Sequence, residues 1–165
     1  MIVFGSLTAS EGKCVLYPVN TISKDLTSFA GTPFCIDSNS TKLTSSLKSV
    51  VKDLQGKASI ITDRQRFIIH LAAVFANNFS NALFQSAYDL LKKEKLSFSL
   101  LQPLIETTVA NIKTNNPVTV QTGPALRGDT VTMKKHLQLL EKDADLKKVY
   151  RLLSALILKQ GKLVK

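Results

Sequence analysis

The feature of the sequence that most constrains the fold is a long apolar stripe at helical spacing that begins near residue 63. Asp63 can cap a helix, and the apolar side chains after it repeat every three or four residues as far as about Lys93. They are Ile68, Leu71, Phe75, Phe79, Ala82, Leu83 and Leu90. At 1.5 Å per residue such a helix is roughly 45 Å long, which is more than a small domain needs for itself. The stripe therefore predicts a spine helix between domains or subunits.

The first 60 residues have a different pattern, in which short apolar runs alternate with turn-forming residues. Gly, Pro, Ser, Thr and Asn separate the runs, as is typical of strands and turns. The runs cover residues 2–4, 14–17, 34–36 and 58–61. Between the last two, Ser40 or Thr41 can cap a helix that Gly56 would end. The order strand, strand, strand, helix, strand predicts part of an α/β sheet.

Three further helices are expected after the spine helix. Ser99 and Gln102 form a capping-box pattern with Pro103 in the first turn, and the later helices are predicted over 130–142 and 144–160. Residues 115–129 form a loop of a length that is usually functional or disordered. We therefore expect an α+β chain, in which a partial α/β segment over residues 1–57 precedes a mainly α-helical C-terminal domain over residues 58–165.

The composition excludes several classes of protein. The chain has 165 residues, 44% of them apolar, so it is neither disordered nor fibrous. Cys14 and Cys35 are too few for a disulfide scaffold and lie in apolar runs, so we expect a cytoplasmic protein. The N-terminus lacks the pattern of a signal peptide. The most apolar window, residues 67–76, is shorter than the roughly 18 to 20 apolar residues of a spanning helix, so no membrane partner is expected.

The net charge of +10 does not by itself indicate a nucleic-acid partner. It arises from 22 Lys and Arg against 12 Asp and Glu. Only four of the positive residues are Arg, which grips phosphates and base edges better than Lys does, and the lysines are spread over the whole chain. We therefore expect a lysine-rich surface with a general attraction for small anions, and no dedicated nucleic-acid interface.

The spine helix carries polar residues that are unusual in so apolar a segment. At 100° per residue, His70, Asn77 and Asn81 lie within about 20° of one another, and Asn78 lies about 80° away. One interpretation is the wall of a polar cleft, in which His70 is the catalytic proton donor or acceptor and the three amides bind substrate. The other is a structural hydrogen-bond network or a polar seam between helices.

The loop before residue 130 holds a second group of candidate substrate-binding residues: Gln121, Thr122, Gly123, Arg127 and Asp129. Gly123 and Gly128 have the spacing of a phosphate-binding P-loop, but Asp129 stands where that motif needs Lys, so we exclude a P-loop. Arg127 and Asp129 can instead hold an anion and a hydroxyl group. Equally, the two side chains can pair and pin the loop onto the next helix.

Several familiar catalytic motifs are missing from the sequence. It contains no CxxC, HExxH or G-x-S-x-G motif, and His136 lies on another helix than His70, so neither a metal site nor a hydrolase is expected. It also contains no G-x-G-x-x-G turn of the kind that binds a dinucleotide.

Three segments together resemble a known family. They are His70-Leu71-Ala72-Ala73-Val74-Phe75-Ala76-Asn77-Asn78-Phe79, Pro103-Leu104-Ile105-Glu106-Thr107, and Gln121 to Ala125 with Arg127-Gly128-Asp129. Residues 58–160 resemble the domain of unknown function 2520, the helical C-terminal half of NAD(P)-dependent oxidoreductases that have a Rossmann-like N-terminal half. Upstream, Gly5-Ser6-Leu7 and residues 16–24 resemble the last strands of that half, although the family commonly has Gln and Phe at Asn20 and Ile22.

The resemblance implies an active site in a cleft between the two halves. His70 and the three asparagines would face the nicotinamide of NADP or NAD and a small polar substrate, and residues 121–129 would form another wall. Gly5, Ser6 and Pro18 would contact the cofactor. The wider group, which includes phosphogluconate dehydrogenase and pyrroline-carboxylate reductase, dimerises through these helices, so a homodimer is expected.

The resemblance also leaves an alternative function open. The Gly-rich turn that holds the pyrophosphate in the family is not among these 165 residues, so we expect residues 1–57 to be a partial Rossmann-like segment and the isolated chain to be inactive. The chain is then either the substrate-side, dimerising part of an oxidoreductase or a non-catalytic helical dimerisation module derived from one.

Overall fold

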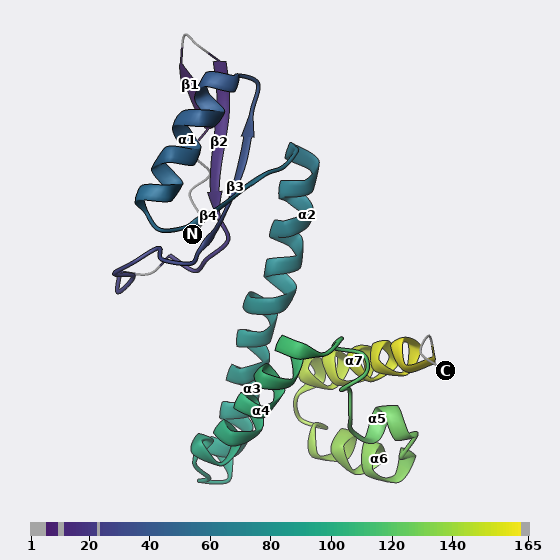
Figure 1. Ribbon diagram of the computed structural model, residues 1–165. Coiled ribbons are helices and arrows are strands. Elements are labelled where there is room, and N and C mark those ends of the chain that lie inside the picture. Colours follow the sequence, from purple (N-terminus) through teal and green to yellow (C-terminus); the bar gives the residue numbers. More distant parts are fainter. Residues whose placement is uncertain (1–5, 10–11, 23, 163–165) are drawn as a thin grey trace. The chain divides into compact units, whose positions relative to one another are not determined.

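The computed structural model describes residues 6–9, 12–22 and 24–162 of the chain, and for residues 6–9 and 12 it describes the backbone only (Figure 1). The chain folds into two compact units, residues 1–82 and residues 83–165. The expected boundary between residues 57 and 58 stays a prediction. The strand expected over residues 2–4 lies outside the described residues.

The first unit is built on a four-stranded sheet with the strand order β1-β2-β3-β4. The strands are β1 (Ser6–Ala9), β2 (Gly12–Pro18), β3 (Pro33–Ser38) and β4 (Lys57–Ile60). The first three are antiparallel neighbours, whereas β3 and β4 run parallel. A parallel pair needs a crossover, and the helix α1 (Thr41–Asp53) provides it. The expected α/β segment is thereby confirmed.

Helix α1 covers one face of this sheet. Of the two predicted caps, Ser40 and Thr41, the N-cap is Ser40, whose side chain accepts a hydrogen bond from the backbone N–H of Leu43. Phe34, Ile36 and Val51 form a buried cluster between α1 and the sheet. Gly56 does not end the helix, because the residue with left-handed backbone is Gln55, at φ 56°. Gly56 is instead required for space, because a Cβ there would lie 2.6 Å from the ring of Phe34.

The opposite face of the sheet is covered by the start of the spine helix. Val15, Tyr17 and Cys35 form a second buried cluster, onto which Val19, Ile61 and Ile69 pack. The spine helix begins with α2 (Asp63–Ala73). Its cap is Thr62 rather than the predicted Asp63, because Thr62 forms a capping box with Gln65.

The spine helix is continuous over residues 63–93 but changes its winding in the middle. After α2 comes a π-helix, η1 (Val74–Phe79), and then α3 (Ser80–Lys93). By length and composition the spine helix could cross a membrane: an 18-residue window of it has a mean hydropathy of 1.4 and is not buried within the protein. The spine helix is therefore more apolar over its length than the window of residues 67–76 alone indicates. His70, Asn77, Asn78 and Asn81 lie on it, and such polar side chains are costly in lipid.

The second unit is helical. After α3 come a 3₁₀-helix η2 (Phe98–Leu101), α4 (Gln102–Thr114), the short α5 (Pro124–Arg127), α6 (Thr130–Leu139) and α7 (Ala144–Lys162). Ser97, and not the predicted Ser99, caps the start of this region, and the 3₁₀ turn precedes Pro103. Helix α7 runs through Gly161, where a Cβ would lie 2.4 Å from the side chain of Leu126. The expected α+β chain with a helical C-terminal part is confirmed.

Candidate functional site

A polar pocket lies in the first unit, between the loop that follows β2 and the π-helical part of the spine helix. Its volume is about 420 Å³. It is lined by Tyr17, Val19, Asn20, Thr21, Ile22, Ala73, Ala76, Asn77 and Asn78. None of these side chains is charged: the polar groups of the pocket are hydroxyls and amides, and Val19, Ile22, Ala73 and Ala76 add apolar surface. Its volume is within the range of small-molecule sites.

Tyr17 and His70 form the most chemically informative contact at the polar pocket. The Tyr17 hydroxyl lies 3.4 Å from Nδ1 of His70, and the two rings pack edge to face. Burial raises the pKa of the Tyr17 phenol, the Cys35 thiol nearby raises it further, and the Arg66 guanidinium opposes the shift. Because the phenol therefore stays protonated at neutral pH, it can donate to Nδ1, which leaves the proton of a neutral imidazole on Nε2.

The π-helix sets the position of the amides in the polar pocket. Asn77 lies within η1, and its Nδ2 donates to Oγ1 of Thr21 at 3.3 Å. The wider turn is supported by Ser80, whose hydroxyl donates to the backbone carbonyl of Phe75 five residues earlier. On the other wall, Asn20 donates to Oγ1 of Thr32 at 3.2 Å. π-turns inside α-helices occur often at functional sites, because they aim side chains that a regular helix cannot.

The same π-turn separates Asn81 from the other candidates. A regular α-helix would place Asn81 within about 20° of His70. The π-turn effectively adds one residue, which rotates everything after it by about 100°. Asn77 and Asn78 accordingly line the polar pocket, whereas Asn81 is exposed on α3 and is not among the lining residues. His70 does not line the pocket either, but it contacts the lining residue Tyr17. All three asparagines are exposed, and the alternative of a structural network or a polar seam between helices stays a prediction.

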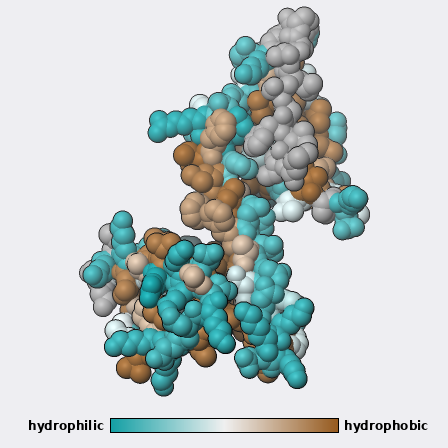
Figure 2. Space-filling view, turned by 180° about the vertical axis from the view of Figure 1, so that it is seen from behind, coloured by the Kyte–Doolittle hydropathy of each residue, from teal (hydrophilic) through white to brown (hydrophobic). Residues whose placement is uncertain are grey.

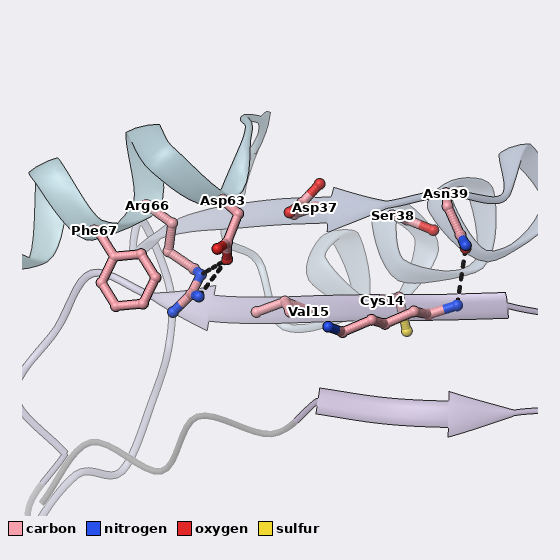
Figure 3. Close-up of a pocket in the computed structure, with 9 residues that line it drawn as sticks. Cys14, Val15, Asp37, Ser38, Asn39, Asp63, Arg66 and Phe67 are labelled. Atoms are coloured by element: carbon pink, nitrogen blue, oxygen red, sulfur yellow. Dashed lines mark hydrogen bonds and ion pairs between the residues drawn. The ribbon is translucent and has the colours of Figure 1, made fainter.

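A second pocket lies where α2 begins, against β2 and β3 (Figure 3). Its volume is about 430 Å³, and Lys13, Asp37, Asp63 and Arg66 bring charge into it. Arg66 is buried, forms an ion pair with Asp63 and lies 4.5 Å from the centre of the Phe67 ring. The guanidinium is thus held in place, and its charge opposes the rise in the pKa of Tyr17 that burial causes.

The loop candidates belong to the second unit. Gly123 has φ 109° and begins α5, and Gly128 ends it in the left-handed region at φ 70°. Asp129 caps α6: its Oδ1 accepts from the backbone N–H of Thr132 at 3.0 Å and its Oδ2 from the Thr132 hydroxyl at 2.7 Å. These bonds lower the pKa of Asp129, and the Arg127 charge adds to the effect. Substrate binding by these loop residues stays a prediction; they are Gln121, Thr122, Gly123, Arg127 and Asp129.

The three residues expected to contact a cofactor are described unequally. Gly5 lies outside the described residues, and Ser6 pairs with Val15 at the start of β1. Pro18 ends β2 and pairs with Phe34. In the described part of the chain, no group of three or more His, Cys, Asp or Glu side chains could hold a metal ion.

Three polar lining residues were not among the sequence candidates: Tyr17, Asn20 and Thr21. Strand alternation places Tyr17 on the same face as Val15, toward the spine helix, but the sequence does not show which helix covers that face. The only available signal was the polar pair Asn20-Thr21 directly after an apolar strand.

Comparisons with known proteins agree with this architecture. The model of the family described as a domain of unknown function, DUF2520, matches residues 32–157, so the predicted resemblance is confirmed and begins earlier than residue 58. No curated protein matches the chain. The structure of a candidate NADP oxidoreductase from Bacteroides fragilis is similar, with a TM-score of 0.84 and 37% identity over 88% of this chain and 57% of its own.

A second structure, of a protein from Thermotoga maritima, shows the same fold. It has a TM-score of 0.74 and 22% identity, over 93% of this chain and 63% of its own length. The chain therefore spans less than two thirds of each of these two relatives. Since the family match covers more than half of the chain, the protein belongs to the DUF2520 family, an oxidoreductase-related family with a Rossmann-like fold.

Proposed function

We propose that the polar pocket is the substrate side of an NAD(P)-dependent oxidoreductase that acts on a small polar substrate. The observation that carries the proposal is the Tyr17–His70 contact beside a pocket lined with amides. In this proposal His70 exchanges a proton with the substrate oxygen or nitrogen, and Tyr17 fixes its tautomer. Asn77 and Asn78 orient the substrate by hydrogen bonds.

The lining of the polar pocket fits one part of the cofactor. Amide and hydroxyl groups match the carboxamide of a nicotinamide ring, and Asn20, Thr21 and Asn77 would hold it. A nicotinamide cofactor supplies hydride transfer when it is bound. The lining has no cation for the pyrophosphate, so the phosphates would be bound by other groups.

The experiment combines the chain with the part of the Bacteroides fragilis protein that it does not match, as a mixture and as a fusion. Binding of NADPH and NADH is followed by fluorescence, and turnover of small carbonyl and imine compounds by NADPH absorbance. His70→Ala is expected to slow turnover about 10²-fold or more with little change in NADPH affinity, because it removes a proton-transfer group. Asn81→Ala is the matched control and is expected to leave turnover unchanged.

The proposal fails if the combined protein binds neither nucleotide. It also fails if His70→Ala turns substrate over as fast as Asn81→Ala does.

A second candidate function, a dimerisation module without catalysis, is favoured by the apolar side chains exposed on the spine helix. Phe67, Leu71, Phe75 and Phe79 follow one another at intervals of four residues, and each is about half exposed. Figure 2 shows apolar surface in the part of the molecule that this helix forms. A soluble protein seldom exposes so continuous an apolar line. We propose that a second copy of the chain covers this apolar line in a homodimer, whether or not the protein is an enzyme. We also propose that the protein is cytoplasmic.

A further inference from the structure

A larger pocket lies in the second unit and plays no part in the proposed function. Its volume is about 660 Å³, and it is lined by Leu90, Lys93, Glu94, His136, Leu139, Leu140, Lys142, Asp143 and Tyr150. The side chains come from the end of α3, the end of α6, the turn after it and the middle of α7. All of them belong to the second unit, whereas every residue of the polar pocket belongs to the first.

One wall of this second-unit pocket is a hydrogen-bonded ring pair. Nδ1 of His136 lies 2.9 Å from the hydroxyl of Tyr150, and the rings meet edge to face with their centres 5.7 Å apart. This contact fixes both rings. Leu140 is buried beside them, while Leu90 and Leu139 are exposed at the opening. The pocket therefore has a rigid aromatic wall and an apolar lining, as is usual in small-molecule sites.

Two ammonium groups and two carboxylates line the second-unit pocket, and they differ in how far they are already engaged. Among the described residues, the ammonium groups of Lys93 and Lys142 have no carboxylate within ion-pair distance. The carboxylate of Asp143 is engaged at the start of α7, where it accepts from the backbone N–H of Leu146 at 2.9 Å. Glu94 supplies one further negative charge. The positive end of α7 offsets part of the charge of Asp143, so the two lysines, which lie next to an apolar lining, are the charged groups best able to bind a ligand.

We propose that the second-unit pocket binds a small organic acid with an apolar body. The carboxylate would lie between Lys93 and Lys142, and the hydrocarbon part would pack on Leu90, Leu139 and Leu140. Such a site is separate from the polar pocket, which carries no charge and would reject the same ligand. It gives the helical unit a binding function that does not depend on the proposed oxidoreductase activity.

The test uses the full chain with octanoate as the probe, and with octanol as its uncharged counterpart. Binding is followed by chemical-shift changes in the ¹H–¹⁵N spectrum. Octanoate is expected to shift the signals of Leu90, His136, Leu139 and Tyr150 and to bind more tightly than octanol. Lys142→Gln and Lys93→Gln are each expected to weaken octanoate binding about two- to fivefold, as one partly exposed ion pair would, without affecting octanol.

Two further variants separate charge from apolar contact. Lys113→Gln removes the same charge from α4, outside the pocket, and is expected to change nothing. Leu139→Ser is expected to weaken both probes, since Leu139 is 81% exposed and its replacement leaves the core intact.

Three outcomes would overturn the proposal. Octanol could bind as tightly as octanoate, and neither lysine substitution could weaken octanoate binding. The pocket would then be an apolar groove that does not recognise an acid. Octanoate could shift the signals of the polar pocket instead. Finally, the signals of Leu90 and Leu139 could change with protein concentration alone and octanoate fail to compete, which would assign the groove to a second copy of the chain.

Discussion

Gly56 lies directly against the ring of Phe34, which is 2% exposed and cannot move aside. We expect Gly56→Ala to lower the free energy of unfolding by about 1–3 kcal/mol, because the added methyl group overpacks the core. Denaturant unfolding of the purified chain measures this. Gln55→Gly, at the neighbouring residue, is the control. Gln55 has a left-handed backbone at φ 56°, and the substitution adds no atoms, so the free energy of unfolding should change by less than about 1 kcal/mol. Equal effects at both positions would contradict the steric explanation.

Asp129 makes the stability of the second unit depend on pH. Hydrogen bonds from Thr132 lower the pKa of Asp129 in the folded state. The ionised carboxylate therefore stabilises the fold fully above the pKa of an unfolded Asp, and this stabilisation is lost as the pH falls through the lower pKa of the folded state. Asp129→Asn keeps a capping side chain but cannot titrate. As the pH falls from neutral to about 2, the melting temperature of this variant should decrease less than that of the parent. The control Asp145→Asn, at a 92% exposed carboxylate, should leave the parent's profile unchanged.

The polar pocket and His70, which contacts its lining residue Tyr17, show what sequence alone could and could not predict about the site. His70, Asn77 and Asn78 were identifiable, because polar side chains are conspicuous in an apolar helix. Their partners Tyr17 and Thr21 lie more than 50 residues earlier in the chain. Which strand a helix covers is decided by long-range packing, and no local pattern encodes it.

The helices and strands themselves were largely predictable. Strands β2, β3 and β4 and helices α1, α4, α6 and α7 all correspond to predicted segments, because short apolar runs and helical periodicity differ clearly. Strand β1 and the short α5, which lies in the segment predicted as a loop, have no predicted counterpart, and the other errors concern the helix ends. Thr62 lies beside Asp63, and Ser97 lies two residues before Ser99, so each start offered two good caps. The choice between them depends on the backbone conformation before the helix.

The π-helix η1 has no counterpart in the sequence pattern, because its extra residue shifts the apolar stripe without breaking it. Ser80→Ala removes the hydroxyl that donates to the carbonyl of Phe75 across this wider turn. We expect faster hydrogen exchange over residues 74–79 in this variant, since that carbonyl loses a partner. The matched control is Thr108→Ala, which removes a similar bond to Leu104 in regular α-helix. If exchange speeds up equally in α4, the π-turn has no special dependence on Ser80.

For the molecule as a whole, the apolar line on the spine helix predicts a dimer. Leu71→Lys combined with Phe75→Lys places two charges in the proposed interface and should convert the dimer to monomer, because buried unpaired charge is costly. Light scattering over a concentration series measures the change. Gln85→Lys, which adds charge elsewhere on the same helix beside Asp89, should leave the dimer intact. A parent chain that stays monomeric at high micromolar concentration would contradict the prediction.

In the proposed function, the polar pocket of the first unit receives the reactive end of a nicotinamide cofactor and its substrate. The most direct measurement is of nuclear Overhauser contacts between the nicotinamide ring protons of NADPH and the protein, in the chain combined with the unmatched part of the Bacteroides fragilis relative. We predict contacts to Tyr17, Thr21 and Asn77. Bound NADPH whose ring contacts other residues, and none of the polar pocket, would contradict the claim.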